Sequence, residues 1–274
     1  MKNFKYSIHH LLFFLILGSC DSLKKETPNQ TENEKTEEPT SNKPTTSEFF
    51  EMADFERKAD NCESGSCSEV TVDYPRFLSA HGNSVKINKL VIKTINETIS
   101  DFILEDDVPF NTTALANQFL ASYADFKKNF PDSRTAWYLN VKATPTYISQ
   151  HVVSVKFEVS SYSGGAHPNT TVRYLNVGKE GKEELKLGYF FKKPRHIKNL
   201  AEQVFRSQEG LAENDSYSDK GFIFDNDKFE LSEVFGFDES GLIILYNPYE
   251  ISSYSDGPTS LMIPFDQLED NFKY

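Results

Sequence analysis

The sequence predicts an α+β protein with mainly antiparallel sheets, about three packed helices and two sub-domains. Three observations indicate this class. Segments with apolar residues at every second position come in runs rather than alternating strictly with helices, which is typical of α+β proteins. Three other segments repeat apolar residues at helical spacing. The 274 residues suffice for one large domain or two small ones.

Composition excludes several classes of protein. The chain has 29 Lys and Arg against 41 Asp and Glu, a formal net charge of −12, and 38% apolar residues. It is too apolar for a wholly disordered chain and too polar for a protein with many membrane spans. An acidic chain lacks the basic surface of a nucleic-acid-binding protein, so no nucleic-acid partner is expected. Three cysteines are too few for a small disulfide-framework scaffold.

Residues 1–19 are expected to form a lipoprotein signal peptide. Lys2 and Lys5 precede the apolar run 11–17, which is long enough for a signal-peptide core and too short to span a bilayer as a helix. The run ends in the sequence LGSC, which resembles the bacterial lipobox. That resemblance implies cleavage before Cys20 and a lipid on its thiol, and two or more acyl chains give a stable membrane anchor. An ordinary signal peptide followed by a chance cysteine is the alternative.

Residues 20–46 predict a flexible tether. The segment consists mainly of Glu, Lys, Thr, Asn and Pro, so it buries too little apolar surface to offset the entropy of ordering. A flexible coil of this length reaches roughly 25–30 Å, which lifts a globular domain off a membrane. Residues 47–180 and 181–274 are then predicted to form an N-terminal and a C-terminal α+β domain.

The first folded elements are expected to be two strands around a pair of cysteines. Residues 49–55 and 69–74 read as strands, and Pro75 is expected to end the second one. Cys62 and Cys67 lie between them, and a disulfide between the two is the expected state after export. A metal site is the alternative, although no histidine or third cysteine is near in the sequence.

Three helices are predicted along the chain. Residues 85–103 repeat apolar residues at helical spacing. A second helix is expected to start at Asn111 or Thr112, both favourable caps, and to stop at Pro131. The third begins at Pro194, a residue that fits the first turn of a helix. The apolar faces of these helices are interpreted as core faces.

The remaining segments read mainly as strands. Short strands are expected at 137–141 and 146–148, followed by the clearest strand, 153–159, with one buried and one solvated face. Its return strand is 171–177, and residues 185–190 continue the sheet or its exit. Further strands are expected at 222–224, 229–231, 242–246 and 261–263, before a short helical turn at 264–268.

The C-terminal part resembles a known domain. The sequence YNPYEI at 246–251 is followed by Tyr254 and by the Gly257-Pro258 pair. This pattern is similar to the domain of unknown function in the extracellular part of RsiV, a transmembrane anti-sigma factor. Ser252-Ser253 departs from the usual Ala-Pro of that pattern.

The N-terminal part resembles the companion domain that precedes this domain. The companion also occurs in PdaC, a peptidoglycan deacetylase, apart from its catalytic domain. The resemblance is carried by residues 67–74, the helix after them, the 153–159 strand and the sequence SGGAH at 163–167. Because the extracellular region of RsiV is similar to a lysozyme receptor, the resemblance implies binding of a lysozyme-like protein or peptidoglycan.

The expected protein is therefore a non-enzymatic, lipid-anchored protein of the cell envelope. Abundant Lys, Asn, Phe and Glu resemble the composition of proteins from Bacteroidetes, where such lipoproteins sit in the outer membrane of a Gram-negative cell. The sequence contains none of the common catalytic or cofactor-binding motifs, so no catalytic residue, metal or cofactor is expected. A glycan-acting hydrolase or deacetylase and a structural subunit of an envelope complex are the alternative functions.

The first candidate ligand-binding loop is the glycine-rich turn 163–169. Gly164 and Gly165 permit positive φ and close backbone approach, and His167 and Asn169 follow them. A histidine on such a turn suits a binding surface, and in an enzyme it would serve as acid or base. The structural alternative is that His167 caps or packs its own turn.

The second candidate loop is 247–258. Tyr249 and Tyr254 flank Glu250 there, and loop tyrosines suit contacts to proteins or sugars. The structural alternative is that Tyr249 is a buried anchor and that Glu250 satisfies backbone donors.

Overall fold

The computed structural model describes residues 48–60, 67–79, 82–178, 181 and 184–274. These residues belong to one unit, 44–274, and the other unit is 1–43. The predicted signal peptide, the lipidated Cys20 and the tether therefore lie outside the described residues. So does Cys62, and its pairing with Cys67 stays a prediction.

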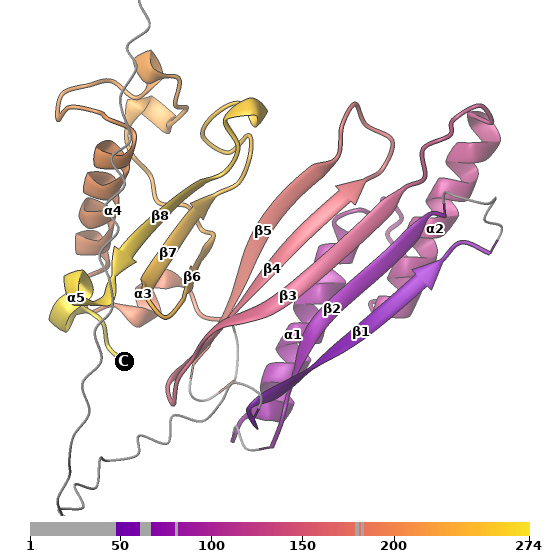
Figure 1. The fold of residues 1–274 in the computed structure, drawn as a ribbon, viewed down its shortest axis with the longest axis horizontal. Helices are drawn as coiled ribbons and strands as arrows, with labels where there is room; N and C mark the ends of the chain where they lie inside the picture. The colour runs from indigo at the N-terminus through magenta and orange to yellow at the C-terminus, as the bar shows by residue number, and fades with distance from the viewer. Residues whose placement is uncertain (1–47, 61–66, 80–81, 179–180, 182–183) are drawn as a thin grey trace, which may run out of the picture. The chain divides into compact units, whose positions relative to one another are not determined.

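A five-stranded sheet forms the first part of the fold (Figure 1). Neighbouring strands pair antiparallel except β2 and β3, which are parallel because two helices connect them. These helices, α1 and α2, cover one face of the sheet. In spatial order the strands are β1 (Phe50–Lys58), β2 (Glu69–Phe77), β3 (Tyr138–Ile148), β4 (Val152–Tyr162) and β5 (Asn169–Gly178), and the helices are α1 (Ser84–Ser100) and α2 (Thr112–Asn129).

The core between this sheet and its helices follows the predicted periodicities. In α1 the buried apolar residues are four apart, from Ile87 to Ile99, and in β4 they are two apart, from Val153 to Val159. Asn111 caps α2 by accepting a hydrogen bond from the Ala114 N–H at 3.0 Å. Within the described residues, no helix combines the length and apolar character needed to cross a bilayer.

The strand β2 runs through Pro75, which was predicted to end it. The Glu69 N–H donates to the Trp137 carbonyl on the β3 side, and the Leu78 N–H donates toward β1, so odd-numbered residues of β2 direct their N–H toward β3. Pairing with β3 ends at Asp73. Pro75 therefore lacks a donor only where no partner strand requires one.

The segments 137–141 and 146–148 form one strand, β3, rather than the two that were predicted. A register shift between Pro145 and Tyr147 marks a β-bulge, so the pairing with β4 continues on both sides of it. A proline inside the segment made it resemble two short strands, although the bulge accommodates the missing N–H.

A three-stranded antiparallel sheet forms the second part of the fold (Figure 1). The helix that begins at Pro194 packs against β8, as the sequence predicts. The strands are β6 (Phe235–Phe237), β7 (Gly241–Tyr246) and β8 (Thr259–Pro264); the helices are α3 (Leu187–Phe190), α4 (Pro194–Gln208) and α5 (Phe265–Leu268), with short 3-10 turns η2 (Ser218–Lys220), η3 (Asp225–Asp227), η4 (Tyr254–Asp256) and η5 (Glu269–Asn271).

The strands predicted at 222–224 and 229–231 are wrong. Phe222, Phe224 and Phe229 come from irregular segments and surround Phe205 of α4 at ring-centroid distances of 4.9–5.6 Å. Short apolar groups do not distinguish a strand from a loop that packs on a core. For the same reason β6 was missed, and the segment before α4 forms the short helix α3 instead of a strand.

Buried hydrogen bonds join β6 to the first sheet. Ser154, predicted on a solvated strand face, is fully buried because β6 lies beside it. Its Oγ donates to Asn176 Oδ1 at 2.8 Å and accepts from the Phe237 N–H at 3.0 Å, and Asn176 Nδ2 donates to the Phe235 carbonyl at 2.7 Å. Every polar group of this network is paired, as buried groups require. The predicted α+β class with mainly antiparallel sheets is confirmed.

Candidate functional site

The two loops singled out in the sequence contact each other, although they are 82 residues apart. The imidazole of His167 stacks on the ring of Tyr254, with centroids 4.1 Å apart and planes 28° apart. Tyr249 Oη lies 3.4 Å from His167 Nε2, and the two tyrosine rings lie 5.3 Å apart. We call His167, Tyr249 and Tyr254 the aromatic cluster.

The tautomer of His167 follows from its neighbours. Its Nδ1 lies 2.8 Å from the carbonyl of Pro168, which can only accept, so Nδ1 carries the proton in the neutral ring. Nε2 is then the acceptor for the hydroxyl of Tyr249. Tyr254 Oη donates to the same Pro168 carbonyl at 2.8 Å. The ring of His167 thus packs on its turn, as the structural alternative predicts, and it also links the two loops.

Gly164 positions the first loop against β3. Its φ is +93°, and a Cβ there would lie 3.1 Å from Trp137 Nε1, so glycine fits both the conformation and the space. Gly165 has no positive φ, and a Cβ there would meet nothing closer than 3.8 Å. Asn169 begins β5, and its exposed side chain makes no hydrogen bond to the described residues.

Asn247 attaches the second loop to β5. Its Oδ1 accepts from the Val172 N–H at 2.7 Å, and its Nδ2 donates to the Val172 carbonyl at 3.0 Å. A carboxamide meets both groups of one peptide unit, so it completes the hydrogen bonding of that residue on the edge strand. Asn247 was not predicted as a site residue, although its place in the YNPYEI motif was a signal for it.

The same loop presents Tyr249 to solvent. Glu250 Oε2 accepts from the Asn247 N–H at 2.8 Å and closes the turn, so Glu250 satisfies a backbone donor as the structural alternative predicts. Tyr249 has a φ of +71° and is 64% exposed, so its interpretation as a buried anchor is wrong. A left-handed conformation costs a non-glycine residue about 1–2 kcal/mol, and such strain concentrates at functional sites.

The charge near the aromatic cluster is acidic. The loop 247–258 carries Glu250 and Asp256 and no lysine or arginine, and the turn 163–169 carries no charged side chain other than the titratable His167. In the described part of the chain, no carboxylate forms a hydrogen bond or ion pair with His167. No three His, Cys, Asp or Glu side chains of the described residues gather as a candidate metal site.

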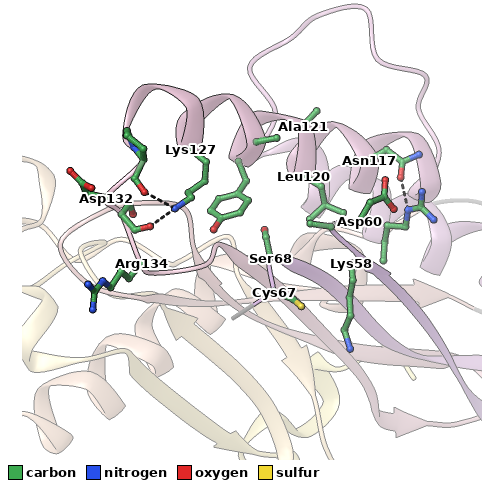
Figure 2. Close-up of a pocket in the computed structure, with 16 residues that line it drawn as sticks. Lys58, Asp60, Cys67, Ser68, Asn117, Leu120, Ala121, Lys127, Asp132 and Arg134 are labelled. Atoms are coloured by element: carbon green, nitrogen blue, oxygen red, sulfur yellow. Dashed lines mark hydrogen bonds between the residues drawn. The ribbon is translucent and has the colours of Figure 1, made fainter. Parts of the chain in front are cut away.

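A separate groove lies between α2 and the end of the β1–β2 hairpin (Figure 2). Its volume is about 1170 Å³, and none of the aromatic cluster lines it. It was not predicted, because its walls come from β1, β2 and the segment from α2 to β3, which only the fold brings together.

Two family models match the sequence. Residues 61–170 match the model described as Deacetylase PdaC, and residues 190–266 match the model described as a protein of unknown function, DUF3298. The matched ranges lie within the predicted domains 47–180 and 181–274 and in the predicted order, so the pairing of domains fits the expected resemblance. The resemblance to RsiV itself stays a prediction, and no curated protein matches the chain.

Two crystal structures are similar to this fold. A member of the DUF3298 family from Bacteroides fragilis is 16% identical over 82% of this chain and 94% of that chain, with a TM-score of 0.61. A DUF3298 family protein from Pseudomonas aeruginosa is 16% identical over the same shares, with a TM-score of 0.60. At this identity the likeness shows the fold alone.

Proposed function

We propose that this chain is a lipid-anchored protein of the cell envelope that binds an extracytoplasmic ligand at the aromatic cluster and does not transform it. The observation that carries the proposal is the exposed Tyr249, held in a left-handed conformation by a turn that Asn247 and Glu250 close. Strain at an exposed aromatic residue has no benefit for the core, so a binding role accounts for it best.

The aromatic cluster has the properties of a binding hot spot. Tyrosine is enriched in hot spots because it offers a large contact area with few rotatable bonds. Tyr249 and Tyr254 are further restrained by each other and by His167, so little conformational entropy remains to be lost on binding.

The charge of the cluster favours a basic protein of the lysozyme type. Glu250 and Asp256 are the charged residues of the 247–258 loop, and the whole chain has a net charge of −12. Complementary charge accelerates association and orients a basic partner. Peptidoglycan is the other ligand implied by the resemblance, and its sugar rings would stack on the tyrosines.

The proposed location follows from the N-terminal sequence. Lipidation of Cys20 would anchor the protein in the outer membrane of a Gram-negative cell, and residues 20–46 would hold the folded part away from the bilayer. Mass spectrometry of the mature protein tests this part. We expect cleavage before Cys20 and a mass increase on that residue, and an unmodified Cys20 would refute the anchor.

Binding is tested with the full-length protein, against hen-type lysozyme and against purified sacculi. We expect Tyr249→Ala to weaken lysozyme binding about 10- to 30-fold, the effect of a hot-spot residue worth about 2 kcal/mol. Phe110→Ala is the matched control, because Phe110 is also an exposed aromatic residue, 54% exposed, on a different loop. Binding of sacculi alone would replace lysozyme by peptidoglycan, and binding of neither would refute the proposed function.

A further inference from the structure

The groove beside α2 contains polar groups that the fold leaves without partners. In Figure 2 Arg134 lies at one end of the groove, Asn117 at the other end, and Ser68 between them. The polar side chains on which the inference depends are those of Arg57, Ser68, Asn117, Tyr123, Lys127 and Arg134.

Ser68 is the central group. It is 1% exposed, and its Oγ has no hydrogen-bond partner in the described structure, whereas its carbonyl accepts from the Ala59 N–H at 3.0 Å. A buried hydroxyl without a partner costs about 1–3 kcal/mol, so most such groups in folded proteins are paired. Tyr123, which lines the same groove, also makes no hydrogen bond through its hydroxyl to the described residues. A ligand in the groove would supply the missing partners.

Cationic side chains lie at both ends of the groove without carboxylate partners. Arg57 Nε donates to Asn117 Oδ1 at 2.8 Å, and Lys127 Nζ donates to two backbone carbonyls at 2.6 and 3.0 Å, so both cations keep their net charge. Arg134 forms no hydrogen bond or ion pair with the described residues. Guanidinium groups bind carboxylates through paired, charge-assisted hydrogen bonds.

Other charged residues of the groove do not cancel these cations. Lys58 is already paired with Glu56 at 2.6 Å and with Glu69 at 3.6 Å. Asp60 and Asp132 also line the groove, and two carboxylates face the three cations of the preceding paragraph. The groove thus has a local cationic excess in a chain whose net charge is −12. Non-specific attraction of an anion by such a chain is not expected.

The length of the groove limits the ligand. Its wall on α2 extends from Asn117 to Lys127, which corresponds to about 15 Å at 1.5 Å per residue. An extended peptide rises about 3.4 Å per residue, so four or five residues span that distance. The volume of about 1170 Å³ also exceeds what a single small molecule usually occupies.

We infer that this groove binds an extended acidic peptide of about four residues. Its carboxylates pair with Arg134 at one end and Arg57 at the other, and its polar groups between them accept from or donate to Ser68 Oγ. This site is distinct from the aromatic cluster and does not depend on the proposed function.

The test titrates the full-length protein with N-acetylated tetraglutamate amide and with the matched tetraglutamine. The single tryptophan, Trp137, reports binding, because its ring lies 5.8 Å from that of Tyr123. We expect tetraglutamate to bind at least tenfold more tightly than tetraglutamine, and its affinity to fall as salt rises from 50 to 500 mM. Equal affinity for the two peptides would overturn the inference.

Two variants locate the site. We expect Arg134→Gln and Ser68→Ala each to weaken tetraglutamate binding at least fivefold, and Ser68→Ala not to lower the melting temperature, because the hydroxyl has no partner within the fold. Arg195→Gln, which removes an exposed arginine of α4, and Tyr249→Ala serve as controls and should bind tetraglutamate as the unmodified protein does. Unchanged affinity in Arg134→Gln and Ser68→Ala would overturn the inference, as would a less stable Ser68→Ala protein of normal affinity.

Discussion

Replacing Asn247 by alanine is expected to loosen the second candidate loop from β5. The substitution removes two hydrogen bonds, from the Val172 N–H at 2.7 Å and to the Val172 carbonyl at 3.0 Å. Each contributes about 0.5–1.5 kcal/mol, so the free energy of unfolding should fall by about 1–3 kcal/mol. Val172 is half-buried, so water replaces part of the loss, and about 2 kcal/mol is the expected value.

The assay is urea unfolding, followed by the fluorescence of Trp137 and by circular dichroism. Asn169→Ala is the matched control, because Asn169 belongs to the same site but makes no side-chain hydrogen bond to the described residues, and it should change stability by less than about 0.5 kcal/mol. Asn247→Asp keeps the acceptor and loses the donor, so its loss should be intermediate. An Asn247→Ala protein as stable as Asn169→Ala would refute the reasoning.

Three further predictions concern single side chains. Gly164→Ala should lower stability by about 1–2 kcal/mol, because φ is +93° and the new Cβ would press on Trp137, whereas Gly165→Ala should be near neutral; equal unfolding midpoints would contradict this. Gly241→Ala should be among the most damaging substitutions, since its Cβ would lie 2.1 Å from the backbone oxygen of Ile263, and an unchanged melting temperature would refute the close contact. Burial raises the pKa of Tyr174 to about 12, above its ordinary value of 10.0, so the folded state holds the phenolic proton more tightly and this residue's contribution to stability is lost as pH rises from 10 to 12. Tyr174→Phe should therefore show a shallower loss of stability in that range, and an identical pH dependence would contradict the assignment.

The elements with a long, regular apolar period were predictable from the sequence. α1 and β4 have buried residues at every fourth and every second position, so the pattern identifies both the element and its core face. The three-residue apolar groups of the C-terminal part were not predictable in this way, because Phe222 and Phe229 pack on α4 from irregular segments.

The candidate residues were predictable as residue types but not as one site. Glycines before a histidine and tyrosines in a loop each indicate a binding surface locally, whereas the stacking of His167 on Tyr254 depends on how β5 and the 247–258 loop meet. The groove was beyond prediction for a different reason. The absence of a partner for Ser68 is a property of the packed interior, and nothing in its sequence neighbourhood signals it.

The network of Ser154 and Asn176 has a consequence for dividing this chain into separately produced pieces. Residues 171–178, most of β5, lie in neither matched family range, yet Asn176 supplies the bond to β6 and Val172 the bond to the 247–258 loop. A piece ending at residue 170 would expose the buried hydroxyl of Ser154 and leave β4 as a raw edge open to self-association. A piece beginning at residue 190 would lose the strand on which β6 rests. The smallest stretch that keeps both sheets intact is therefore longer than either matched range, and the short linking strand is what makes the two parts interdependent.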